Sequence, residues 1–93
     1  MRILIAEDDQ KLLKSLLHIY KTNNYLADGV TNGTDALQYA LTGNYDGLVL
    51  DIMMPGMDGI EVLKQLRSCG FSTPALFLTA KTEVYQRIEG LDN

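Results

Sequence analysis

The chain has 93 residues, of which 46% are hydrophobic and 22% charged, and its formal net charge is −4. These values fit one globular domain, and the few, scattered basic residues exclude an extended grip on a nucleic-acid backbone. No apolar run is long enough to span a membrane and no secretion signal precedes the first strand-like segment, so we expect a cytoplasmic protein without membrane contact.

Short apolar runs alternate with amphipathic stretches, which is the pattern of strands and helices that follow one another in an α/β fold. We expect strands over residues 2–6, 25–30, 46–50 and 74–78, and helices over 10–22, 34–42, 58–68 and from Thr82 onward. Asp28 and Gly29 interrupt the second strand and weaken it. The inward helix faces are predicted to hold Leu12, Leu13, Leu16, Leu17, Tyr20, Ala36, Leu37, Ala40, Leu41, Ile60, Leu63 and Leu66.

The predicted helix ends carry local signals. Asp9 can cap the first helix, and Asp58 with Glu61 has the spacing of a capping box. Gly70 fits the stop after the third helix. Cys69 is the single cysteine, so no internal disulfide can form.

Buried strands joined by helices predict a parallel sheet with right-handed crossovers, in which ligands bind at the carboxyl ends of the strands. Glu7 and Asp8 follow the first predicted strand, Asp51 follows the third, and Thr79 follows the fourth. Taken alone, Asp51 could be a turn residue, and the acids after the first strand could be a solvated strand end. Their joint arrangement instead predicts one site with three converging carboxylates.

Converging carboxylates are hard to keep ionised without a cation, which indicates a divalent metal, best Mg²⁺. Asp8 and Asp51 would bind it directly, Glu7 through a bound water, and Met53 through its backbone carbonyl. A carboxylate can also accept a phosphoryl group and become an acyl phosphate, which makes Asp51 the candidate phosphoacceptor. The Thr79 hydroxyl would then donate to a phosphoryl oxygen.

These residues resemble the receiver domain of two-component response regulators, most closely the subfamily of transcription factors with a winged-helix output domain. The resemblance rests on residues 3–9 (ILIAEDD), 50–59 (LDIMMPGMDG) and 78–80 (LTA), in matching order and spacing. It implies an α/β, flavodoxin-like (CheY-like) three-layer αβα sandwich whose parallel sheet has the order 2-1-3-4-5.

The resemblance also implies a function in phosphorelay signalling. Asp51 would take a phosphoryl group from a sensor histidine kinase with Mg²⁺ bound at Glu7, Asp8, Asp51 and the Met53 carbonyl. Thr79 would move toward the phosphoryl group and change the surface around the fourth helix. Such a domain is not an enzyme beyond slow self-dephosphorylation, and it would reach DNA only through an output domain that these 93 residues lack.

A fifth strand, a fifth helix and an active-site lysine of that family would lie beyond Asn93. We therefore expect residues 1–93 to form a truncated receiver domain with strand order 2-1-3-4 and poor phosphorylation. The exposed edge of the fourth strand, an apolar segment, would favour a homodimer or a rearranged oligomer.

Other functions fit less well. A flavin carrier needs a phosphate-binding loop after the first strand, where Glu7 and Asp8 would repel phosphate. A phosphoaspartyl hydrolase needs a second acid two residues after the nucleophile, where Met53 stands. A non-phosphorylated assembly fragment remains an alternative, whereas His18 is interpreted as a surface residue rather than a phosphotransfer histidine.

Overall fold

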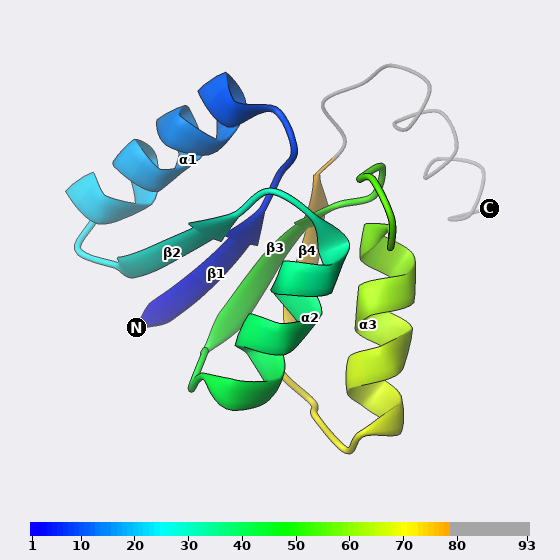
Figure 1. Cartoon of the computed structure of the whole chain (residues 1–93). Coiled ribbons are helices and arrows are strands. Elements are labelled where there is room, and N and C mark those ends of the chain that lie inside the picture. The colour runs from blue at the N-terminus through cyan, green and yellow to red at the C-terminus, as the bar shows by residue number, and fades with distance from the viewer. Residues whose placement is uncertain (79–93) are drawn as a thin grey trace, which may run out of the picture.

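The computed structural model describes residues 1–78, which form an open α/β domain (Figure 1). In chain order the elements are β1 (Arg2–Ala6), α1 (Gln10–Thr22), β2 (Leu26–Val30), α2 (Gly33–Thr42), β3 (Gly47–Asp51), α3 (Gly59–Ser68) and β4 (Ala75–Leu78). Every element predicted within this range is present, and its ends agree to within one residue. The helix predicted from Thr82 lies outside the described residues.

The four strands form one parallel sheet in the order β2-β1-β3-β4. In its register Ile5 of β1 lies beside Gly29 of β2 and Val49 of β3, while Asp51 of β3 lies beside Leu78 of β4. The predicted strand order is therefore confirmed. Because all strands run the same way, their carboxyl ends share one edge, where the connections to α1, α2 and α3 begin.

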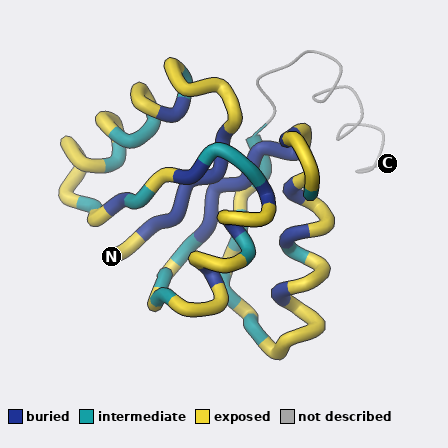
Figure 2. The backbone as a smooth tube through the Cα atoms, viewed as in Figure 1, coloured by how far each residue is buried: buried dark blue, intermediate teal, exposed yellow. Residues whose placement is uncertain are grey.

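The helices cover the two faces of the sheet unequally, with α1 on one face and α2 and α3 on the other (Figure 1). Figure 2 shows the buried residues concentrated along β1 and β3 between these layers. The alternation of side chains along a strand divides the core in two. Leu4, Ala6, Leu48 and Leu50 pack toward α2 and α3, and Ile3, Ile5 and Val49 pack toward α1.

Two predicted core positions are wrong, and both result from the rotation of a helix. Leu41 is 36% exposed and Ile60 is 37% exposed, whereas Val62, which was not predicted, is fully buried. In α2 the buried residues are the small Gly33, Ala36 and Ala40, so this side of the helix can approach the core closely. In α3 Gly59 contacts the end of β3, and Val62 and Leu66 face the core on the same side of the helix.

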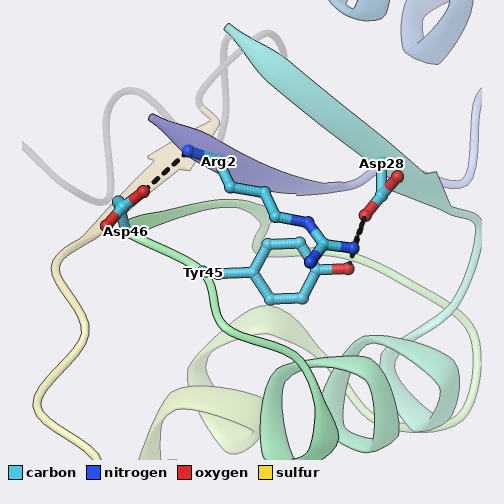
Figure 3. A network of polar contacts seen from close by, with 4 residues as sticks. All are labelled: Arg2, Asp28, Tyr45 and Asp46. Atoms are coloured by element: carbon cyan, nitrogen blue, oxygen red, sulfur yellow. Dashed lines mark hydrogen bonds and ion pairs between the residues drawn. The ribbon is translucent and has the colours of Figure 1, made fainter.

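β2 continues through Asp28 and Gly29: Gly29 pairs with Ile5 of β1, and the Asp28 side chain has partners outside the strand. The Asp28 carboxylate accepts hydrogen bonds from Arg2 Nη2 at 3.1 Å and from the Tyr45 hydroxyl at 2.8 Å (Figure 3). The Arg2 guanidinium lies 5.0 Å from the centre of the Tyr45 ring, and the Arg2 amide donates to Asp46 at 2.7 Å. Burial raises the pKa of Tyr45 to about 12, and the hydrogen bond to Asp28 adds to the increase.

The helix ends follow the local signals closely. Asp9 caps α1 by accepting from the amides of Lys11 and Leu12, and Asp58 caps α3 by accepting from the Glu61 amide at 2.8 Å. The side-chain half of the predicted capping box does not form, since the Glu61 carboxylate accepts from Gln65 instead. Gly70 ends α3 at a φ of 87°, where its amide bonds back to Arg67 and the next amide to Leu66.

Gly33 sits where the start of α2 touches the loop that follows β3. A Cβ atom at this position would overlap the backbone carbonyl of Met57, which cannot withdraw as a flexible side chain could. Gly33→Ala is expected to lower the free energy of unfolding by about 2–3 kcal/mol, measured by urea denaturation. Thr34→Ala, at the exposed neighbouring position, is the control and should change it by less than about 1 kcal/mol. Equal stability of the two variants would contradict this packing.

Candidate functional site

Three carboxylates meet at the carboxyl edge of the sheet. Glu7 and Asp8 directly follow β1, Asp51 is the last residue of β3, and these two strands are neighbours. One carboxylate oxygen from each residue lies within 4.8 Å of the other two. Glu7 is only 3% exposed and Asp51 only 6%, whereas Asp8 faces solvent. The structure thus brings together the three acids that the sequence pattern singled out.

Backbone amides orient two of the three carboxylates. The Asp9 amide donates to Glu7 Oε2 at 2.9 Å, and the Met53 amide donates to Asp51 Oδ1 at 3.2 Å. Each bond spans two residues and turns the acid back over its own loop. Asp9 belongs to the same acidic run but points its carboxylate at α1, so the run Glu7-Asp8-Asp9 contributes only its first two side chains to the cluster.

The cluster resists full ionisation. Burial raises the pKa of Glu7 to about 7, and hydrogen bonding to Asp8 and Asp51 adds to the increase. Burial also raises the pKa of Asp51, and Asp8 raises it further, against the lowering effect of bonds from Glu7 and the Met53 amide. Both shifts have one physical cause: negative charge is confined at a place that water solvates poorly.

This donor set fits a hard divalent cation. Carboxylate oxygens are the preferred ligands of Mg²⁺, which is usually held by one or two carboxylates and keeps several of its waters. The exposed Asp8 and the adjacent opening leave space for such waters. A dication would also offset the charge that raises the pKa of the two buried acids. The residues present therefore suit the predicted metal.

The loop between β3 and α3 forms one wall of this site. Ile52 and Met54 are buried and hold the loop to the core, while the Met53 side chain is 44% exposed. Beside Asp8 the loop borders an open pocket of about 520 Å³. It is lined by Asp8, Ile52, Met53, Met54, Gly56, Asp58 and Ile60. The predicted role of the Met53 carbonyl stays a prediction, and Thr79 lies outside the described residues.

Sequence reasoning missed the part played by Gly59, the first residue of α3. Its amide donates to the Ile52 carbonyl at 3.0 Å, and a Cβ atom there would overlap the backbone of Asp51. The absence of a side chain thus lets the start of α3 rest directly on the strand end that carries the acid. A glycine just after a helix-capping aspartate is the available signal, whereas the sequence pattern predicts only that residue 59 lies in the helix over residues 58–68.

Taken together, the doubly wound parallel sheet and the acidic crevice at its carboxyl edge define the class of the molecule. Residues 3–93 match the family model described as "Response regulator receiver domain". This chain belongs to the response regulator receiver domain family and thus to two-component signalling. None of the helices in residues 1–78 combines the length and the apolar character needed to cross a bilayer.

Known relatives agree with this membership. The transcriptional regulatory protein DltR of Streptococcus agalactiae is 41% identical over 92 residues, which are 99% of this chain and 41% of DltR. The chain therefore spans about two fifths of the length of this relative.

Solved structures agree in fold. The receiver domain of the Francisella response regulator 1452 superimposes with a TM-score of 0.85 at 36% identity, covering 98% of this chain and 75% of that one. The receiver domain of the Pseudomonas aeruginosa sensor histidine kinase PA1611 matches with a TM-score of 0.81 at 26% identity, covering 86% of this chain and 67% of its own. The latter holds a magnesium ion coordinated in its active-site cleft.

Proposed function

We propose that Asp51 is the phosphoacceptor of this receiver domain and that Glu7, Asp8 and Asp51 hold Mg²⁺ beside it. The single observation that carries this proposal is the meeting of three carboxylates, two of them buried, within 4.8 Å at the end of adjacent strands. The backbone carbonyl of Met53 is the proposed fourth ligand, and the magnesium site of the PA1611 receiver domain supports the choice of metal.

The surroundings of Asp51 and of the metal ligands suit their proposed roles. Asp51 is fixed by the Met53 amide, so one of its oxygens is held in place and the carboxylate keeps one orientation toward the crevice. Bound Mg²⁺ would supply positive charge next to the oxygens of an incoming phosphoryl group. Burial excludes water from Asp51 and so favours an acyl phosphate over its hydrolysis.

The proposed donor is a phosphohistidine of a sensor histidine kinase. An Asp51 oxygen forms the new P–O bond while the P–N bond to the donor imidazole breaks, and the imidazole nitrogen takes up a proton. Thr79 is the proposed hydroxyl donor to a phosphoryl oxygen, with a change in the surface around the fourth helix as the output. The resemblance to DltR suggests that DNA is reached through a separate output domain of a longer protein.

Mg²⁺ titration tests the metal site. The wild-type chain is expected to bind Mg²⁺ at up to millimolar concentration and to unfold at higher temperature with the metal, because binding to the folded state alone stabilises it. Asp8→Asn removes a ligand and should weaken binding by about ten-fold or more. Asp46→Asn is the matched control, since Asp46 bonds the Arg2 amide far from the cluster, and it should leave the affinity unchanged.

The same titration distinguishes the phosphoacceptor proposal from the alternative of a non-phosphorylated assembly fragment. That alternative is favoured by Leu76, which is 65% exposed on β4, a strand paired only with β3 among the described residues. Such an edge can pair with a second copy of the chain. No Mg²⁺ binding at millimolar metal, with dimers by light scattering, would replace the phosphoacceptor proposal with this one.

A further inference from the structure

The connection between β2 and α2 carries none of the site's carboxylates, yet its backbone touches the segments after β1 and after β3. The Val30 carbonyl at the end of β2 accepts a hydrogen bond from the Glu7 amide at 3.0 Å. Gly33, the first residue of α2, is buried against the backbone carbonyl of Met57 in the loop between β3 and α3. Residues 30–33 therefore hold the two sides of the acid cluster at a fixed separation.

The start of α2 is itself held firmly. The Asn32 side-chain oxygen accepts from the Asp35 amide at 2.8 Å, and the Asn32 side-chain amide donates to the Asp35 carboxylate at 3.0 Å. Ala36, one turn further on, packs the helix against the core. Because these contacts leave α2 little room to withdraw, a methyl group at Gly33 would push the Met57 backbone outward instead.

A displacement of Met57 would reach the acid cluster through the Met53 backbone. Only three residues separate the two, and one of them, Pro55, has a fixed φ, so little of a shift is absorbed on the way. The Met53 amide donates to Asp51 Oδ1 at 3.2 Å, which is long for such a bond and leaves little room for further stretching. The contact at Gly33 thus bears on the orientation of Asp51.

We infer that Gly33 is a positioning residue of the metal site. Acting through Met57, it keeps the loop between β3 and α3 where the Met53 backbone can orient Asp51 and present its carbonyl to the cation. The inference rests on the proposed function, because it takes that carbonyl as a ligand. Mg²⁺ demands near-ideal octahedral geometry with bonds of about 2.0–2.1 Å, whereas Ca²⁺ accepts longer bonds and irregular geometry. A displaced carbonyl therefore lowers the affinity for Mg²⁺ more than the affinity for Ca²⁺.

Gly33→Ala tests this role through the ratio of two affinities. Mg²⁺ and Ca²⁺ are titrated separately into the chain while the amide shifts of the folded form are followed by NMR. The variant should bind Mg²⁺ about ten-fold more weakly than wild type, and Ca²⁺ less than about three-fold more weakly. Loss of stability alone weakens both apparent affinities by the same factor, the folded fraction, and so leaves their ratio unchanged.

Gly47→Ala is the matched control. Gly47 begins β3, the strand that ends at Asp51, but a Cβ atom there would crowd only the end of the Ile3 side chain, at 3.1 Å. This variant should keep the wild-type ratio of affinities. Without metal, the Met53 amide signal should move in Gly33→Ala, because its bond to Asp51 lengthens, and stay in place in Gly47→Ala. In wild type, Mg²⁺ should shift the Gly33 and Met53 amides with one midpoint, a measurement that needs no variant.

The results that overturn this inference differ from those that reject the phosphoacceptor proposal. An unchanged ratio in Gly33→Ala, or an equal fall in Gly47→Ala, would overturn it while Mg²⁺ binding by wild type stands. So would a Met53 amide signal that does not move in metal-free Gly33→Ala, or a Gly33 signal that does not move when wild type binds Mg²⁺. If Gly33→Ala does not fold even in trimethylamine N-oxide, which favours compact states, the wild-type shift of Gly33 decides the question. Absence of Mg²⁺ binding by wild type would reject both.

Discussion

Asp51→Asn is expected to abolish phosphoryl transfer to this domain while making the fold more stable. The amide cannot form an acyl phosphate, so incorporation should fall below detection rather than to a fraction of wild type. At neutral pH the same change removes a negative charge that is 6% exposed beside Glu7 and Asp8. The free energy of unfolding should rise, because burial raises the pKa of Asp51 and the neighbouring Asp8 raises it further.

Intact-mass measurement after long incubation with phosphoramidate and Mg²⁺ detects even a slow acceptor. Wild type should gain one phosphoryl group, and Asp51→Asn none. Asp58→Asn is the matched control, because asparagine is as good a helix cap and the exposed side chain borders the same pocket. Incorporation that persists in Asp51→Asn would move the acceptor to another residue, and none in wild type would reject the proposal for these 93 residues.

Glu7 is expected to make the metal-free domain less stable as the pH rises. Its pKa is about 7 in the folded chain and 4.5 when it is solvated, so the folded state binds more protons than the unfolded state between these values. Stability therefore declines from about pH 4.5 to 7, and the loss is complete above that range. A shift of this size corresponds to at most about 3 kcal/mol.

Glu7→Gln should remove most of this dependence. The side chain keeps an oxygen that can accept from the Asp9 amide but carries no charge, so we expect a gain of about 2 kcal/mol at pH 8 and little change at pH 4.5. Urea denaturation in the presence of a chelator, repeated at several pH values between these two, measures the change in the free energy of unfolding. Glu61→Gln, at an exposed acid on α3, is the control. A Glu7→Gln curve parallel to wild type at every pH would contradict the assignment of the slope to Glu7.

The position of the acid cluster was predictable because it follows from topology alone. Glu7 and Asp8 follow one apolar run and Asp51 follows another, and in a parallel sheet both run ends must lie at the same edge. The adjacency of β1 and β3, given by the resemblance to receiver domains and confirmed here, then places the carboxylates side by side. Helix caps such as Asp9 and the stop at Gly70 were predictable too, since they depend on a few neighbouring residues.

The rotation of the helices was not predictable, because it depends on contacts between distant segments. Apolar periodicity favoured Ile60 as a core residue, but the direct contact of Gly59 with the end of β3 turns Val62 inward instead. Likewise Asp28 weakens a strand when it is considered alone. Its partners, Arg2 and Tyr45, are 26 and 17 residues away in the chain, and no local pattern reveals them.

The Arg2, Asp28, Tyr45 and Asp46 contacts join β1, β2 and the segment before β3 (Figure 3). Because Arg2 begins β1 and the other strand of the acid site starts just after Asp46, these contacts lie toward the end of the sheet opposite the acids. These contacts thus hold the strands together at one end of the sheet, and the acid cluster lies at the other end. Rearrangement of the loops after β1 and β3 can then proceed without loosening the strands themselves.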